Sequence, residues 1–353
     1  MNKKRHFAIV FFIWLTQVFL VRAQDPQLSQ MYAAPLLISP AFAGIDNQSN
    51  VHFTHRNQWP GLNANYQFSA ISANIALGNQ KSGLGIIMTS DKQFMNLQTT
   101  QLGLQYGHHI DLGEDIRLSA GIQTDLYMRS LDASQFLFAD QFRSINYGFI
   151  SSSNDVFFQD NVANTTIKRS NFVDFSSGAL LNLRNSWIGL TAHHINQPDK
   201  SIFNGTNDPL NTKFGIQMGT KIIFEDPYLN RTTSNPWANK EVSISPVVHY
   251  KKQGKFDQLD MGAYLTVSPL VAGVWYRGIP ISKTNYNRES LIFLLGYRLD
   301  SFSVGYSFDM TISKLGSSAG GAHELSIAYL LDLDLSRSKR TKLLNSKLAC
   351  PKF

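Results

Sequence analysis

The stretch from Ile116 to Arg129 alternates between apolar and polar side chains with almost no error. One face carries Ile116, Leu118, Ala120, Ile122, Leu126 and Met128, and the other carries Arg117, Ser119, Gly121, Gln123, Asp125 and Arg129. A period of two is typical of a β-strand with two different faces. At about 3.3 Å per residue this strand reaches roughly 45 Å, whereas globular strands usually have about 5–6 residues. The pattern therefore favours a tilted strand that crosses a membrane, with one face toward lipid and the other toward a polar interior.

The first residues have the pattern of a secretory signal peptide. Lys3, Lys4 and Arg5 precede an apolar stretch over residues 7–21, and Val21-Arg22-Ala23 supplies aliphatic or small residues at the positions that a signal peptidase reads. The alternative, a retained membrane anchor, is disfavoured because a spanning helix needs roughly 20 apolar residues. We expect residues 1–23 to be a signal peptide that is cleaved after Ala23.

The net charge of +7 resides in the two ends of the chain. Without the basic residues of the signal peptide and of residues 336–353, the remainder is mildly acidic. Nucleic-acid binding therefore loses its support, because it requires a basic face on the fold. Cys350 is the single cysteine, which excludes an internal disulfide framework.

Segments like Ile116–Arg129 recur along the whole chain and predict an all-β fold. We expect a transmembrane antiparallel β-barrel of about 14 strands over residues 51–335, since single-chain bacterial outer-membrane barrels have an even number of strands. The soluble alternative, a large β-sandwich or a lipocalin-like barrel, would expose its apolar face to water. The predicted strands are Val51–Trp59, Tyr66–Ile75, Ser82–Thr89, Thr99–Ile110, Ile116–Arg129, Phe172–Leu183, Ser186–His194, Lys213–Phe224, Val242–Lys251, Phe256–Val267, Leu270–Arg277, Glu289–Leu299, Phe302–Thr311 and Ala322–Leu333.

The lengths of the connections predict which end of the barrel faces the periplasm, because outer-membrane barrels have short periplasmic turns and longer outer loops. If the first strand runs outward, the connections after even-numbered strands should be short. Most of them are, whereas Ser130–Asn171 and Ile195–Thr212 are long outer connections. One pair breaks the rule, because Glu225–Glu241 is long and Gln253-Gly254-Lys255 is short.

Two segments lie outside the predicted strands. Residues 24–50 contain Pro26, Pro35 and Pro40 among aliphatic and aromatic residues, which indicates an ordered but irregular segment. We expect it to fold into the lumen as a plug or to cover the periplasmic mouth. The basic tail, residues 336–353, is expected in the periplasm, where it either docks on a partner or stays free.

No catalytic motif is present, and we expect neither an enzyme nor a cofactor. His108-His109 and His193-His194 are not expected to chelate a metal, because neighbouring strand residues point to opposite faces. A surface hydrolase that uses Asp309, Glu324 and His323 is disfavoured, since His323 would face lipid. The polar residues expected to face the lumen are Arg117, Asp125, Asp174, Asp309 and Glu324. The candidates for partner binding are Arg56, Trp59, Phe138, Phe149, Phe157, Phe203, Asn204, Tyr286, Arg337 and Arg340.

The order of several short motifs resembles one known family. The opening motifs are Gln24-Asp25-Pro26-Gln27-Leu28-Ser29-Gln30, Pro40-Ala41-Phe42-Ala43-Gly44 and Arg56-Asn57-Gln58-Trp59-Pro60. The closing motifs are Gly305-Tyr306-Ser307-Phe308-Asp309, Gly321-Ala322-His323-Glu324 and Cys350-Pro351-Lys352-Phe353. Together they resemble the PorP/SprF family, outer-membrane components of the type IX secretion and gliding machinery of Bacteroidota.

The resemblance implies a non-enzymatic outer-membrane barrel. Such a barrel would serve the export or surface anchoring of a cargo protein with a B-type C-terminal sorting domain, together with other type IX secretion components. The alternative from another class is a passive outer-membrane channel or transporter for small solutes. The sequence leaves the identity of the cargo open.

Overall fold

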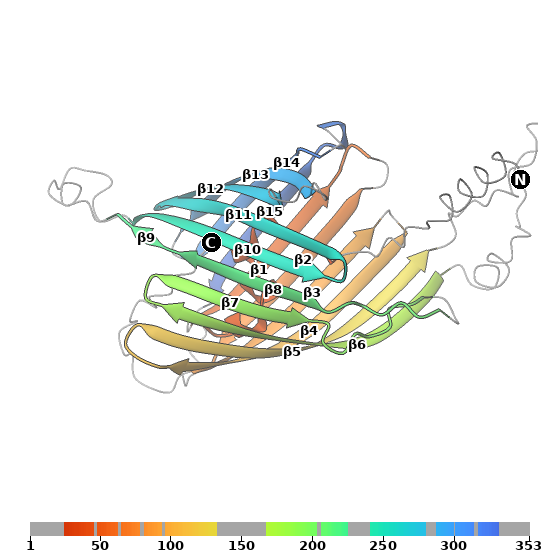
Figure 1. Cartoon of the computed structure of the whole chain (residues 1–353), viewed down its shortest axis with the longest axis horizontal. Coiled ribbons are helices and arrows are strands. Elements are labelled where there is room, and N and C mark those ends of the chain that lie inside the picture. The colour runs from red at the N-terminus through yellow and green to blue at the C-terminus, as the bar shows by residue number, and fades with distance from the viewer. Residues whose placement is uncertain are drawn as a thin grey trace, which may run out of the picture.

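The computed structural model describes residues 25–45, 48–62, 65–77, 81–93, 96–132, 167–202, 206–224, 241–279, 287–299, 301–313 and 317–331. Its strands form one antiparallel sheet that closes on itself, because β1 pairs with β15 and β10 pairs with β11. The strands are β1 (Ser49–Gln58), β2 (Tyr66–Ala76), β3 (Ser82–Gln93), β4 (Leu97–Asp111), β5 (Ile116–Asp132), β6 (Ile167–Leu183), β7 (Ser186–His193), β8 (Lys213–Thr220), β9 (Ile222–Ile223), β10 (Val242–Gln253), β11 (Phe256–Val267), β12 (Leu270–Ile279), β13 (Asn287–Arg298), β14 (Phe302–Thr311) and β15 (Ala322–Leu331). Figure 1 shows them as one tilted wall around the lumen.

The predicted barrel of fourteen strands is confirmed. The described residues contain fifteen strand segments, but β8 and β9 both pair with β10 along one line and share a single position in the barrel. The strand predicted over Lys213–Phe224 was therefore wrong in one respect, since it is interrupted at Lys221. Closure leaves no free edge among the described strands, which satisfies the backbone hydrogen bonds inside a membrane.

Some connections are shorter than the alternation predicts. β5 continues to Asp132 and β6 begins at Ile167, so part of the predicted outer connection Ser130–Asn171 is paired strand. β3 likewise extends to Gln93 and pairs with β4 from Leu97. These extensions are mostly polar, so the alternation of apolar residues does not reveal them. Cross-strand hydrogen bonds continue the strand pairing beyond the apolar band.

The barrel has two distinct ends. At the turn end, where β1 begins at Ser49 and β15 ends at Leu331, β6 joins β7 through residues 184–185 and β11 joins β12 through residues 268–269. At the opposite loop end, residues 194–212 connect β7 with β8. The connection between β10 and β11 at the loop end is only Gly254 and Lys255, as the sequence indicated.

The outward face of the barrel is apolar, and the inward face is polar. Leu104 and Ile122 point outward and are 62% and 64% exposed, whereas Gln105 and Gln123 beside them point inward and are buried. Such a face is stable only against lipid, so the fold is a transmembrane barrel. No helix within the described residues is both long and apolar enough to cross a membrane.

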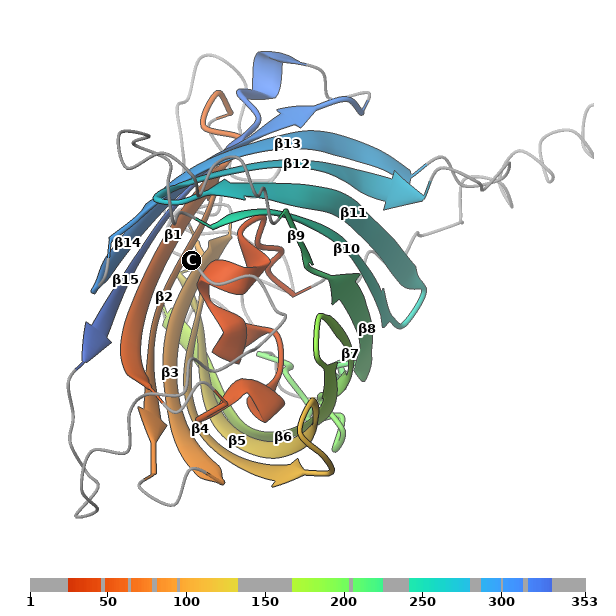
Figure 2. The same cartoon turned by 90° about the vertical axis from the view of Figure 1, so that its left-hand side faces the viewer.

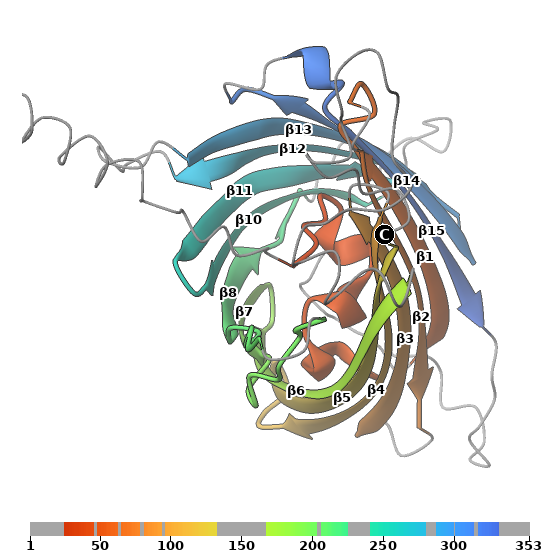
Figure 3. The same cartoon turned by 90° about the vertical axis from the view of Figure 1, so that its right-hand side faces the viewer.

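The N-terminal segment, residues 25–45, lies inside the barrel (Figures 2 and 3). It contains three short 3₁₀ helices: η1 (Met31–Ala33), η2 (Pro35–Leu37) and η3 (Pro40–Phe42). Pro35 and Pro40 each stand at the first position of a helix, where their missing N–H costs nothing. A further 3₁₀ helix, η5 (Ser317–Ala319), lies in the connection between β14 and β15.

Candidate functional site

The N-terminal segment crosses the whole lumen, from the loop end to the turn end. Near the loop end, the Asp25 carboxylate pairs with Lys213 at 2.5 Å and with His194 at 2.9 Å. Near the turn end, Arg117 donates a hydrogen bond to the carbonyl of Ile45 (3.3 Å). The chain then turns back and enters β1 at Ser49. The segment therefore runs through the lumen, and its two ends lie at opposite mouths of the barrel.

Six charged side chains on the inner wall form one buried ion-pair cluster. Its members are Arg56, Lys251, Asp260, Arg277, Asp309 and Glu324, from β1, β10, β11, β12, β14 and β15. Arg56 contacts Asp309 at 2.8 Å and Glu324 at 3.2 Å. Arg277 bridges Asp260 (3.1 Å) and Asp309 (3.2 Å), and Lys251 lies 3.0 Å from Asp260. Three cations thus balance three carboxylates, as buried charges require.

The ion-pair cluster holds the N-terminal segment by its backbone. The two oxygens of Glu324 accept the N–H groups of Ser29 (2.7 Å) and Gln30 (2.9 Å). The Ser29 hydroxyl donates to Asp309 (2.7 Å) and accepts from Arg56 (2.7 Å). Charge-assisted hydrogen bonds to backbone groups are short and strong, so this contact fixes one position of the segment within the barrel.

A row of four glycines on neighbouring strands makes room for the N-terminal segment on a part of the wall away from the ion-pair cluster. Gly83, Gly107, Gly121 and Gly178 are direct cross-strand partners on β3, β4, β5 and β6. A Cβ atom on any of them would overlap residues 39–44. This glycine row therefore forms a flat track for η3 and the residues after it.

Tyr32 of η1 contacts an aromatic group that comes from β7, β11 and β12. Its ring meets Trp187 edge-on with a centroid distance of 5.9 Å and Tyr264 at 6.3 Å. The Trp187 indole N–H donates to the Tyr32 hydroxyl (3.1 Å). Trp275 packs on Tyr264 in turn, with ring centroids 5.1 Å apart. These large side chains are buried, and they fill the lumen beside the segment with apolar atoms.

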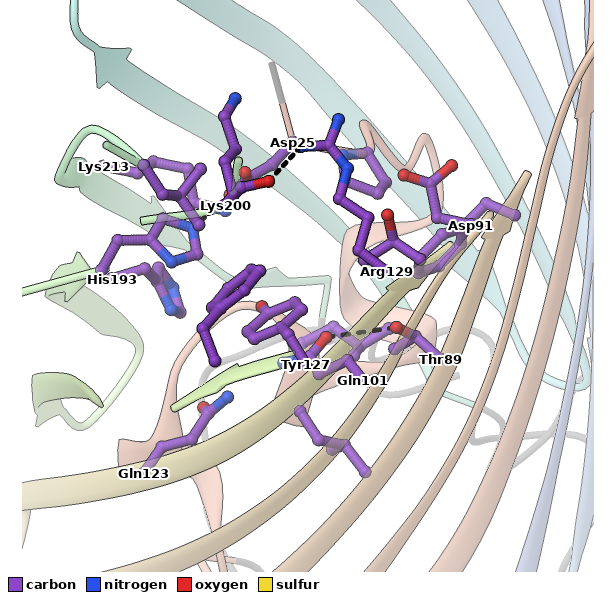
Figure 4. A pocket seen from close by; sticks show the side chains of 18 of the residues that line it. Asp25, Thr89, Asp91, Gln101, Gln123, Tyr127, Arg129, His193, Lys200 and Lys213 are labelled. Carbon is purple, nitrogen blue, oxygen red and sulfur yellow. Dashed lines mark hydrogen bonds and ion pairs between the residues drawn. The ribbon is translucent and has the colours of Figure 1, made fainter. Parts of the chain in front are cut away.

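A pocket of about 150 Å³ remains at the loop end, between the N-terminal segment and the inner wall (Figure 4). Leu28, Leu36 and Ile87 supply apolar lining, and Tyr127 and Phe172 stack on each other with centroids 5.0 Å apart. The polar lining includes Asp25, Asp91, Arg129, Lys200 and Lys213. This mixture suits an apolar ligand with a charged end.

His194 connects the segment with the wall at the rim of this pocket. Its Nε2 lies 2.9 Å from Asp25 and its Nδ1 2.8 Å from Asp174, so both ring nitrogens donate to carboxylates and the imidazole is cationic. Burial alone would lower the pKa of His194, but the Asp25 charge and the two hydrogen bonds raise it to about 9. Burial opposes the ionisation of Asp25, yet Lys213 and His194 outweigh it and hold the pKa of Asp25 well below its usual value.

The prediction that His193 and His194 point to opposite faces was wrong. Both are buried, because His194 follows the end of β7 and has a left-handed backbone (φ 58°) that turns its side chain inward. His108 and His109 do alternate, and His109 donates to the carbonyl of Ala43 (2.9 Å). In the part of the chain that the structure describes, no group of three His, Cys, Asp or Glu residues has the arrangement of a metal site.

The five polar residues expected in the lumen all lie on the inner wall. Asp309 and Glu324 belong to the ion-pair cluster and Asp174 binds His194. Asp125 accepts hydrogen bonds from Gln101 and Gln123, and Arg117 pairs with Asp111 at 2.6 Å.

Of the ten candidates for partner binding, only Arg56 and Trp59 lie within the described residues. Arg56 is buried and binds the chain's own N-terminal segment, and Trp59 directly follows β1, where its N–H donates to the carbonyl of Gly321 (2.7 Å). Phe138, Phe149, Phe157, Phe203, Asn204, Tyr286, Arg337 and Arg340 lie outside the described residues.

Sequence reasoning missed Lys251, Asp260 and Arg277 of the ion-pair cluster, as well as Ser29. The available signal was a charged residue within an otherwise apolar strand, since such a residue is expected to face the lumen and to be paired. Arg129 and Lys200 at the pocket were missed as well. Lys200 lies in a long connection, where alternation gives no indication of direction.

The comparisons with known proteins find one family model and several solved structures. A family model described as "Type IX secretion system membrane protein PorP/SprF" matches residues 20–329. A search of curated proteins finds no match. Among solved structures, Acinetobacter baumannii outer membrane protein Omp33 has 10% identity and a TM-score of 0.41, and the match covers 82% of this chain and 100% of that chain. The Ralstonia pickettii toluene transporter TbuX has 10% identity and a TM-score of 0.43, with 84% and 93% covered.

Proposed function

Because the chain belongs to the PorP/SprF family of type IX secretion system membrane proteins, we propose that it binds a secreted cargo protein at the cell surface and assists its export or anchoring. The cargo is proposed to carry the B-type C-terminal sorting domain that the family resemblance implies. Other components of the secretion and gliding machinery are the further partners. The protein itself is not an enzyme in this proposal and uses no cofactor.

The filled lumen is the observation that favours a binding role over a channel. The N-terminal segment spans the barrel and is held by the ion-pair cluster at Ser29 and by the glycine row at η3. A path for free diffusion needs an open, water-filled lumen, as in porins. Because the ion-pair cluster and the glycine row both hold the backbone of this segment, the lumen is occupied. The loop end then offers a surface on which a protein can bind.

The proposed orientation places the loop end outside the cell. The connections between β5 and β6 (residues 133–166) and between β7 and β8 (residues 194–212) then face the medium. They contain the candidates Phe138, Phe149, Phe157, Phe203 and Asn204. Cleavage of the signal peptide after Ala23 would leave Asp25 near the outer mouth, and the basic tail over residues 336–353 would lie in the periplasm.

The experiment is purification of the tagged barrel from native membranes after crosslinking, followed by identification of the bound proteins. Replacing residues 133–166 with a short Gly-Ser linker should abolish recovery of the cargo while the barrel still assembles. A matched variant replaces residues 225–240, the long connection at the turn end, and should retain the cargo. Equal recovery of cargo by all three proteins would reject the assignment of the outer connections.

Conductance of the purified protein in planar bilayers separates this proposal from a passive channel. The intact chain should conduct little, because the N-terminal segment occupies the lumen. A large, steady conductance of the intact chain, without cargo in the native preparation, would favour the channel instead.

A further inference from the structure

The pocket at the loop end has room for one ring-sized apolar group. Its volume of about 150 Å³ equals that of an apolar cavity known to accept a benzene molecule. Leu28 and Leu36 come from the N-terminal segment, and Ile87 and Phe172 come from the wall. The pocket therefore exists only while the segment is in place, since both are needed to enclose it.

Arg129 is the cation of this pocket that no ion pair neutralises within the described residues. Its Nη1 donates to the carbonyl of Lys200 at 3.1 Å, and its buried Nε has no hydrogen-bond partner in that part of the chain. Lys213, by contrast, pairs with Asp25. Lys200 lies 3.6 Å from Asp208, which is itself half exposed. Asp91 and Asp208 act on Arg129 from beyond ion-pair distance, so its Nε remains able to donate to a carboxylate at the edge of the apolar pocket.

Asp91 lies on the same part of the wall as Arg129 and offers an acceptor (Figure 4). Gln93 donates to its Oδ2 (2.9 Å), and the Tyr66 hydroxyl interacts with the same carboxylate, which has further acceptor sites. Asp91 and Arg129 both pair with Thr99, on the strand between them, so they stand two strand positions apart, roughly 10 Å. A ligand that places an N–H near Asp91 and a carboxylate near Arg129 would satisfy both groups.

We propose that this pocket binds a carboxylate attached to one large apolar or aromatic group, with Arg129 as the carboxylate partner. The source that fits Asp91 as well is the C-terminal residue of a polypeptide, whose backbone N–H, side chain and carboxylate match the acceptor, the apolar lining and the cation. This proposal rests on the proposed function in taking a bound protein as the source. A small free acid shares the chemistry of the carboxylate and the ring but lacks the N–H.

The test uses the purified barrel in detergent and a fluorescein-labelled Gly-Ser-Gly-Ser-Phe peptide with a free C-terminal carboxylate. Fluorescence anisotropy should show saturable binding, and the same peptide with a C-terminal amide should bind at least about tenfold more weakly. Arg129→Gln should cause a similar loss. Arg184→Gln is the matched control, because this arginine lies in the turn between β6 and β7 with a side chain that is 73% exposed.

Equal affinity for the acid and the amide, or no saturable binding, would overturn the proposal. That comparison uses the unaltered protein, so it decides the matter even if Arg129→Gln does not assemble. Phenylpropionate should compete at least about tenfold less well than the peptide; equal competition would overturn the assignment to a chain end. Recovery of cargo from native membranes is measured independently, so a failure here without loss of cargo leaves the proposed function standing.

Discussion

The backbones of Gly44 and Gly83 lie so close that a Cβ atom on either residue would overlap the other. Gly44 has a positive φ of 77°, which glycine adopts without strain, and its N–H donates to Asn74 (2.7 Å). Two glycines separated by 39 positions in the sequence thus bring the end of the N-terminal segment onto the wall of the barrel. The segment fits against the wall because glycine has no side chain at these two positions, as well as through its hydrogen bonds.

A bulky side chain in the glycine row should displace the segment. Gly121→Val places its side chain against the Pro40 backbone, and overpacking of this kind costs about 1–3 kcal/mol. We expect the barrel to assemble and its conductance in planar bilayers to rise. Gly113→Val is the control, because no atom lies within 4 Å of its Cβ position. A conductance equal to that of the unaltered protein would contradict the role of the row.

Removing one cation from the ion-pair cluster should destabilise the protein strongly. Arg277→Met removes one of the two cations paired with Asp260 and one partner of Asp309, and breaking a buried pair in this way costs about 3–5 kcal/mol. We expect a lower unfolding temperature in the heat-dependent gel-shift assay for folded barrels. Arg184→Met, which removes only a 3.9 Å contact between exposed side chains, should leave that temperature unchanged. A similar temperature for both variants would argue against the cluster as an anchor.

The Tyr32 hydroxyl should be important for the position of Trp187. Tyr32→Phe removes the acceptor of the Trp187 indole N–H, and a buried donor without a partner costs about 1–3 kcal/mol. The expected result is a lower urea midpoint, followed by tryptophan fluorescence. Tyr329→Phe on the lipid-facing side, where the residue is 53% exposed, serves as the control. The hydrogen bond would be unimportant if both midpoints were the same.

Attachment of the segment at the loop end should depend on pH in both directions. The pKa of His194 is raised from 6.5 to about 9, so its contribution is complete below about pH 6.5 and is lost as the pH rises through about 9. The pKa of Asp25 lies well below its usual 3.8, so its contribution is complete above that value and is lost in stronger acid. The attachment should therefore be firmest between about pH 4 and pH 6.5.

A spin label on Pro26→Cys in a Cys350→Ser background reports this attachment. Its mobility should be low near pH 6 and should increase above about pH 9 and in strong acid. In His194→Gln the label should already be more mobile at pH 6, and the alkaline transition should disappear. If the mobility of the label did not change with pH, the Asp25 and His194 pair would not be what attaches the segment at the loop end.

Much of the barrel could be predicted from single strands. The alternation around Leu104 and Ile122 identifies the lipid face, because each residue's direction follows from its parity within one strand. The even number of strands and the short turns at one end follow from the same pattern. His194 shows the limit, since one left-handed residue at the end of β7 reverses the rule for its own side chain.

The sequence by itself determined a closed antiparallel barrel with an irregular segment before its first strand, because alternation and proline placement act over a few neighbouring residues. Only the tertiary structure decided that this segment crosses the lumen, that four glycines stand in one row, and that Arg129 borders a pocket. These features depend on the register between strands and on contacts such as Ser29 with Glu324, which are 295 positions apart. Local periodicity carries no information about contacts between residues so far apart in the sequence. The site therefore forms only when the barrel closes and brings them together.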